Sequence, residues 1–183
     1  PFNVDGVDPQ KVKGDPRLFT KKKIPGISSK TKTISNANYL WIQYFRAYLN
    51  ERGRAGFVMA QSATDAGHGE KALRQEIVET GDVDIMVSIG TNFFYTRTLP
   101  CSLWFFDRGK PEARRDKTLM LDARGIYRVV SRVIRDFSEE QLANLIELGC
   151  GAAQGFLLGR PLDAAGATGL VAGRPGAAKR LTS

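Results

Sequence analysis

The chain has 183 residues, of which 42% are hydrophobic, so it is long and apolar enough to bury the core of one domain. No run approaches the roughly 20 apolar residues of a membrane span, and no charged start followed by an apolar segment indicates a signal peptide. Cys101 and Cys150 are too few for a disulfide framework, and the single histidine argues against a zinc site. We therefore expect a cytoplasmic protein that contacts no membrane and holds no metal.

The formal net charge of +8 is unevenly distributed. Between Lys11 and Lys32, eight basic residues stand against one acid, Asp15. Such clustering favours a polyanionic partner, most commonly a phosphate backbone. A solvated or disordered loop explains the same composition equally well. The glycines and prolines of residues 3–35 predict a long loop there.

A helix is expected next, capped by Ser35 or Asn36 and ending before Gly53. Its apolar face is expected to be core and not a base-stacking surface. That face comprises Tyr39, Leu40, Ile42, Tyr44, Phe45, Tyr48 and Leu49.

The following segments alternate between strand and helix patterns. They are a strand at Arg54–Ala60, a loop at Gln61–Gly69, a helix from about Glu70 to Thr80, and a strand at Val83–Ile89. This order predicts a right-handed crossover that pairs residues 54–60 and 83–89 in parallel. The loop at 61–69 and the segment Asn92–Thr98 then share one rim of the sheet, where α/β proteins bind ligands.

Two apolar runs, Val83–Ile89 and Leu99–Phe106, are separated by a Gly-Thr-Asn break, which predicts a hairpin. We expect it at the edge of an α/β sheet, with Asn92–Thr98 offered to a ligand. A short strand is expected at Leu119–Asp122. Residues 137–148 read as a helix in which Ser138 and Gln141 form a capping box. Beyond Gly149 the chain is rich in glycine and alanine, and weak order is expected after about Leu162.

The residues themselves do not reveal a complete catalytic centre. His68 lies in the rim loop and is a candidate general base, although a lone loop histidine is more often merely exposed. No Ser or Cys nucleophile with an acidic orienter is evident, and no Gly-rich phosphate loop occurs. Cys101 is expected to be a buried apolar side chain.

Residues of about 1–144 resemble a known family. The resemblance rests on three segments, which are Pro1-Phe2, LNERGRAGFVMA, and GEKALRQEIVETGDVDIMVSIGTNFFYTRTLPCSLWFFDRGK. They resemble the modification subunit of type I restriction-modification systems, which are S-adenosylmethionine-dependent, adenine-specific DNA methyltransferases. The resemblance implies the carboxyl-terminal part of a Rossmann-like methyltransferase sheet, mixed, with an antiparallel edge hairpin and truncated at its N-terminal side.

The resemblance also implies roles for particular residues. Pro1 and Phe2 match the end of the family's catalytic Asn-Pro-Pro-Phe motif, so Phe2 would stack on an extruded adenine. Phe94 and Tyr95 match a later motif that contacts the target base, although one of them is expected to anchor the hairpin in the core. Lys21, Lys22 and Lys23 would contact the DNA backbone.

The family's Gly-rich cofactor motif lies upstream of the catalytic motif and is absent from this sequence. We therefore expect the chain alone to bind no S-adenosylmethionine and to be inactive without the missing half. In the family, the partners are DNA and the specificity and restriction subunits. Two alternatives stay open, namely a non-catalytic remnant that binds nucleic acid or a partner, and a non-functional fused chain.

Residues 145–183 are expected to be an unrelated or weakly ordered tail. Within it, residues of about 148–165 resemble the end of EAL-type cyclic-di-GMP phosphodiesterase domains. The matching residues are Gln154, Gly155, Phe156, Arg160 and Pro161. No metal carboxylates accompany this match, so phosphodiesterase activity does not carry over.

Overall fold

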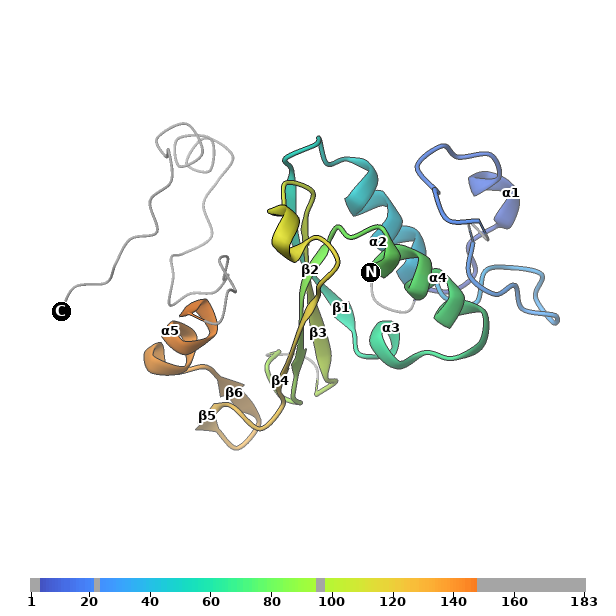
Figure 1. The fold of residues 1–183 in the computed structure, drawn as a ribbon. Helices are drawn as coiled ribbons and strands as arrows, with labels where there is room; N and C mark the ends of the chain where they lie inside the picture. Colours follow the sequence, from blue (N-terminus) through green and yellow to red (C-terminus); the bar gives the residue numbers. More distant parts are fainter. Residues whose placement is uncertain (1–3, 22–23, 95–97, 148–183) are drawn as a thin grey trace, which may run out of the picture. The chain divides into compact units, whose positions relative to one another are not determined.

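The computed structural model describes residues 4–21, 24–94 and 98–147, which contain one four-stranded sheet and one small hairpin (Figure 1). The strands are β1 (Arg54–Ala60), β2 (Val83–Ile89), β3 (Cys101–Asp107), β4 (Leu119–Ala123), β5 (Arg128–Ser131) and β6 (Ile134–Asp136). The helices are α1 (Pro9–Val12), α2 (Asn38–Ala47), α3 (Ser62–Asp65), α4 (His68–Glu79) and α5 (Glu139–Glu147), with a 3₁₀ turn at Glu112–Arg114.

The strand order in the main sheet is β1-β3-β2-β4. β3 is antiparallel to both of its neighbours, and β2 and β4 are parallel. The expectation of a mixed α/β sheet is confirmed. The predicted direct pairing of 54–60 with 83–89 is wrong, because the chain folds back after β2 and β3 enters between the two. The β2–β3 hairpin therefore supplies the two central strands of this sheet, and not its edge.

Alternation along the strands divides the apolar residues between two faces of the sheet. On one face, the buried side chains of Met86 and Trp104 pack with residues of α2, α3 and α4, including Tyr39 and Leu73. On the other face, a cluster around Ile85, Val87, Ile89 and Cys101 is joined by Phe137 and by Leu145 of α5. Figure 1 shows α2, α3 and α4 together on one side of the sheet.

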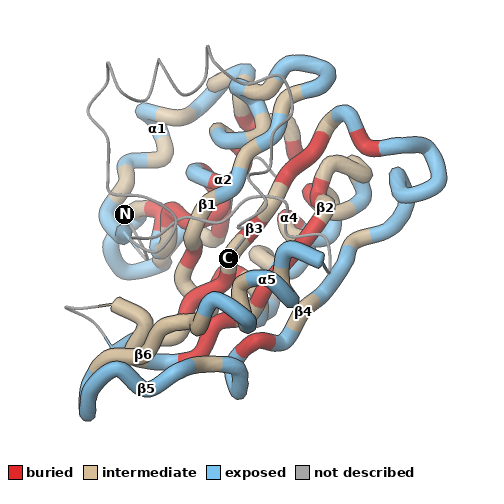
Figure 2. The backbone as a smooth tube through the Cα atoms, turned by 90° about the vertical axis from the view of Figure 1, so that its left-hand side faces the viewer, coloured by how far each residue is buried: buried red, intermediate tan, exposed pale blue. Residues whose placement is uncertain are grey.

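The N-terminal segment is more ordered than a solvated loop. Ile34 forms bridges with Val7 and with Ile27, and Leu18, Ile34 and Leu40 share a small buried core. Arg17 is held by ion pairing to Asp15 at 2.6 Å. Lys11, Lys13 and Lys21 are nevertheless exposed, and the tube around α1 is pale blue over part of its length (Figure 2).

The sequence predicted the helix α2 but neither its cap nor its exposure. The N-cap is Ala37, without a side-chain cap bond, and not Ser35 or Asn36. Tyr39 and Ile42 are fully buried, as expected for core residues. Phe45 and Tyr48 are 40% and 70% exposed, so their assignment to the core is wrong. A helical apolar stripe wider than the sheet that covers it must leave its outer members in solvent.

Two further segments differ from the expectation. The predicted loop at 61–69 contains α3 and the start of α4, and the hairpin β5–β6 was not foreseen. The capping box of α5 is confirmed, since the main-chain N–H of Ser138 donates to Gln141 Oε1 at 2.9 Å and that of Gln141 donates to Ser138 Oγ at 3.2 Å.

Among the described residues, no helix has both the length and the apolar character needed to cross a membrane.

The two tryptophans provide a matched test of the core. Trp104 is fully buried and Trp41 is 37% exposed. Trp104→Ala should lower the free energy of unfolding by about 3–5 kcal/mol, because it removes a large buried side chain and leaves a cavity. Trp41→Ala should cost about 1 kcal/mol or less. Urea unfolding followed by circular dichroism measures both, and equal losses would contradict the described core.

Candidate functional site

The rim of the sheet is formed where β1 and β2 end and β3 begins. Ala60 and Ile89 both pair with Cys101, one on each side of β3. The residues that follow, Gln61 and Gly90, therefore leave the sheet on either side of the same strand. This is the rim that the sequence predicts, although a third strand separates its two loops.

The loop after β2 is held in place by the main chain. A side chain at Gly90 would approach the carbonyl oxygen of Arg124 to 2.7 Å, so only glycine allows this close contact. Asn92 adopts a left-handed conformation, with φ of 71°. Its carbonyl oxygen accepts a hydrogen bond from the N–H of Arg135 at 2.8 Å. The unforeseen β5–β6 hairpin thus positions the loop.

The aromatic residues of this loop pack inward as far as they are described. Phe93 lies 4.8 Å from the ring centre of Phe137, and Phe94 is half-buried against the cluster around Ile85 and Ile89. Tyr95 lies outside the described residues, as do Pro1 and Phe2. Of the four proposed base-contact or catalytic residues, the structure therefore places only Phe94, in apolar contact with the hairpin.

Two polar side chains at the end of β1 were not singled out from the sequence. Gln61 Oε1 and Thr64 Oγ1 are buried, and neither has a hydrogen-bond partner among the described residues. Buried oxygens without partners are uncommon and mark places that await water or a ligand. The sequence signal that could have identified them is their position in the segment after a strand of an α/β sheet.

The short helix α3 that carries Thr64 is fixed from two sides. The hydroxyl of Tyr39 donates to the carbonyl oxygen of Ala63, and the guanidinium of Arg74 donates to that of Ala66 at 2.9 Å. Close by in sequence, burial raises the pKa of Glu70 above its usual value. The rim thus holds its polar groups on a rigid support.

Other candidate groups do not form a nucleophilic or metal centre. Burial raises the pKa of Cys101 to about 11, so the thiol is protonated at neutral pH and inert. His68 is the first residue of α4, and its side chain is outside the description, so its role as a base stays a prediction. No group of three or more His, Cys, Asp or Glu side chains that could hold a metal occurs among the described residues.

Of the three proposed DNA-backbone lysines, the structure places one. Lys21 is exposed, and its main-chain N–H donates to Glu76 Oε2 of α4 at 2.6 Å. Lys22 and Lys23 lie outside the described residues. The main chain at Lys21 is thus anchored to α4, and the contact of this residue with DNA stays a prediction.

The mixed sheet and its helices define an α/β protein, and comparisons identify its family. The family model described as N-6 DNA methylase matches residues 1–152. The chain belongs to the N-6 DNA methylase family. Enzymes of this family generally depend on S-adenosylmethionine.

Individual relatives agree with this assignment. The MjaIX methylase subunit of a type I restriction enzyme from Methanocaldococcus jannaschii is 36% identical over 149 residues, covering 80% of this chain and 26% of the relative. The HindI methylase subunit from Haemophilus influenzae is 29% identical over 118 residues, covering 64% of this chain and 26% of the relative. The chain thus spans about a quarter of the length of these curated relatives.

A solved structure shows the same fold. The type I restriction-modification methyltransferase subunit from Streptococcus thermophilus superposes with a TM-score of 0.67 at 14% identity, covering 80% of this chain and 29% of that one. The tail from 148 onward lies outside the described residues, so its resemblance to EAL domains stays a prediction. The proposed boundary at 144–145 falls within α5 and also stays a prediction.

The two unpartnered rim oxygens lead to a stability test. Thr64→Val should raise the free energy of unfolding by about 1 kcal/mol, because it removes a buried hydroxyl without a partner. Thr20→Val is the matched control, since Thr20 Oγ1 donates to Gln43 Oε1 at 2.9 Å, and should cost about 1 kcal/mol or more. Urea unfolding compares the two variants. A loss of stability in Thr64→Val as large as that in Thr20→Val would show that Thr64 is satisfied in the free protein.

Proposed function

We propose that this chain is the part of a type I restriction-modification DNA adenine N6-methyltransferase that contacts the target base and the DNA. The observation that carries the proposal is its 36% identity over 149 residues, or 80% of the chain, to a type I methylase subunit. The membership of the N-6 DNA methylase family supports the same reaction class.

The rim is the part of the fold suited to an extruded adenine. A base that leaves the duplex loses its stacking, and aromatic side chains recover part of that energy. Tyr95 and Phe2 are the proposed stacking residues, with Phe94 anchoring the loop that carries Tyr95. The buried oxygens of Gln61 and Thr64 are acceptors, so they suit the N–H donors of the adenine amino group.

The described residues do not fit a complete site for S-adenosylmethionine. After β1, Ala63 of α3 is fully buried, and the described rim offers two unpartnered acceptors but no Gly-x-Gly-x-x-Gly turn that would let the main chain approach a nucleotide. We therefore propose that the chain holds no cofactor by itself. It supplies base positioning, and the methyl donor is bound by the remaining part of the family's catalytic domain.

The exposed basic stretch is the proposed contact with the DNA backbone. Lys21, Lys22 and Lys23 would neutralise phosphates without reading sequence. Recognition of the target sequence would fall to a specificity subunit, and cleavage to a restriction subunit, as the family resemblance implies. Action in the cytoplasm is part of the same proposal, since prokaryotic DNA lies there.

The first test of this function measures methyl transfer. The chain alone should incorporate no labelled methyl group from S-adenosylmethionine into adenine-containing duplexes. Addition of the cofactor-binding half of a related methylase should restore incorporation, and Tyr95→Ala should then reduce it by about 10-fold or more, as expected for the loss of a stacking contact of about 1–3 kcal/mol. Robust methylation by the chain alone, lost on Phe2→Ala, would contradict its dependence on a second half.

The second test concerns the basic stretch. Replacing Lys21, Lys22 and Lys23 together by Gln should weaken duplex binding and reduce the slope of log K against log salt concentration by about 3, or roughly 0.9 per contact. Fluorescence anisotropy at several salt concentrations measures the slope. Replacing Lys71, Lys117 and Arg132 by Gln, three exposed residues outside the basic stretch, removes the same charge and should leave the slope unchanged. Binding that does not depend on salt would exclude a phosphate contact.

A further inference from the structure

A cleft of about 760 Å³ lies at the end of the sheet opposite the rim. It opens where β1 and β2 begin and β3 ends, since Arg54 pairs with Asp107 and Val83 pairs with Phe106. The turn between α2 and β1, the turn between α4 and β2, and the segment after β3 line it. The resemblance to methyltransferases assigns this end of the sheet no role.

The lining of this polar cleft is strongly cationic. It contains six Arg or Lys side chains and three carboxylates. The cations are Arg46, Arg52, Arg54, Arg108, Lys110 and Arg115. Small-molecule pockets are mostly apolar, so this composition favours a ligand that carries several negative charges.

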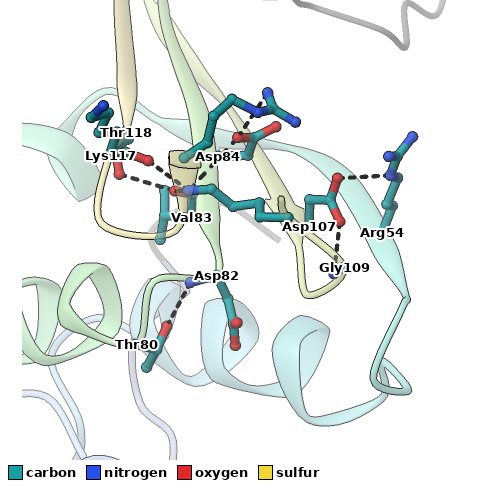
Figure 3. A network of polar contacts seen from close by, with 11 residues as sticks. Arg54, Thr80, Asp82, Val83, Asp84, Asp107, Gly109, Lys117 and Thr118 are labelled. Atoms are coloured by element: carbon teal, nitrogen blue, oxygen red, sulfur yellow. Dashed lines mark hydrogen bonds and ion pairs between the residues drawn. The ribbon is translucent and has the colours of Figure 1, made fainter. Parts of the chain in front are cut away.

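Two of the three carboxylates are already neutralised within the protein. Asp82 lies 2.7 Å from the guanidinium of Arg46 and 3.7 Å from that of Arg108. Asp107 is paired with Arg54 at 2.8 Å (Figure 3). The remaining acid, Glu51, is exposed at the mouth. Even with Asp84, which lies 3.7 Å from the Nζ of Lys110, counted as a fourth carboxylate, the six cations leave the cleft a surplus of positive charge.

The inner cations of the polar cleft are held in place without a ligand. The Nζ of Lys110 donates to the carbonyl oxygens of Val83 and Lys117, at 2.8 and 2.6 Å (Figure 3). The Nη1 of Arg108 donates to the carbonyl oxygen of Leu49 at 2.6 Å. Charged side chains that are already ordered lose little conformational entropy when a ligand binds.

The outer cations are free to reach a ligand. The guanidinium of Arg52 has no ion pair among the described residues and is exposed. Arg115 is 62% exposed and meets only the exposed Glu112, at 3.6 Å. Planar guanidinium groups match phosphate oxygens in bidentate geometry.

We propose that the polar cleft binds the sugar–phosphate backbone of DNA at a point distant from the target base. The proposal rests on the proposed function, in which the chain acts on DNA. β1, β2 and β3 have seven residues each, so the rim and the cleft are about 20 Å apart. Along a duplex that rises about 3.4 Å per base pair, the cleft meets phosphates about six base pairs from the extruded adenine.

This separation makes the length of the DNA the discriminating variable. A hairpin duplex of about 8 base pairs centred on the target adenine reaches the rim only, whereas one of about 24 base pairs reaches both ends of the sheet. The variant Arg52→Gln/Arg115→Gln removes two cleft cations whose side chains hold no buried group. Lys71→Gln/Arg132→Gln, two exposed residues outside the cleft lining, removes the same charge as a control.

With the full chain, the cleft variant should raise the Kd for the long duplex several-fold and reduce its salt slope by about 2, at roughly 0.9 per phosphate contact. Its affinity for the short duplex should equal that of the unchanged protein, and the control variant should leave both affinities unchanged. Circular dichroism verifies that each variant is folded.

Several results would overturn the proposal while leaving the proposed function standing. They are an unchanged salt slope on the long duplex, an equal loss on the short duplex, or an equal loss in the control variant. Binding of an oligoglutamate peptide that is lost in the cleft variant, with DNA binding unaffected, would assign the cleft to an acidic protein segment instead. Absence of binding to either duplex would count against the proposed function itself.

Discussion

The central position of β3 is the constraint on which the rest of the described structure depends. β3 pairs along its whole length with β1 on one side and with β2 on the other. Trp104 and Phe106 face the helices, while Cys101 faces the second apolar cluster, and all three are buried. A strand that is buried on both faces and paired at both edges cannot shift register without exposing its apolar side chains. The two ends of the sheet are therefore fixed relative to each other.

This arrangement gives the two ends of the sheet different chemistry. At the rim, the chain leaves β1 and β2 with buried uncharged acceptors, and the loop after β2 is tied to β6 through Asn92. At the opposite end, arginines from α2, from the start of β1 and from the segment after β3 converge around paired aspartates. An uncharged, partly buried rim suits a neutral base, and an open cationic cleft suits phosphates. Both kinds of group belong to one polymer, DNA.

Much of the local structure was predictable from the residues alone. The strand at Arg54–Ala60, the strand at Val83–Ile89 and the capping box of α5 were all located from local patterns. The β5–β6 hairpin was missed, because Arg128–Ser131 is exposed throughout and carries no alternation of buried and exposed residues. Family membership also came from the sequence, since it depends on motifs in order along the chain.

Tertiary structure alone decided which elements are neighbours and which side chains are covered. The pattern of a strand specifies its faces but not the strand beside it, so the entry of β3 between β1 and β2 was not foreseen. The aromatic stripe of α2 likewise did not show that Tyr39 is buried while Tyr48 is 70% exposed. The cationic cleft draws on residues from Arg46 to Arg115, a span over which only folding brings charges together. The sequence by itself determined the elements and the family, and the packing of distant segments determined the two sites.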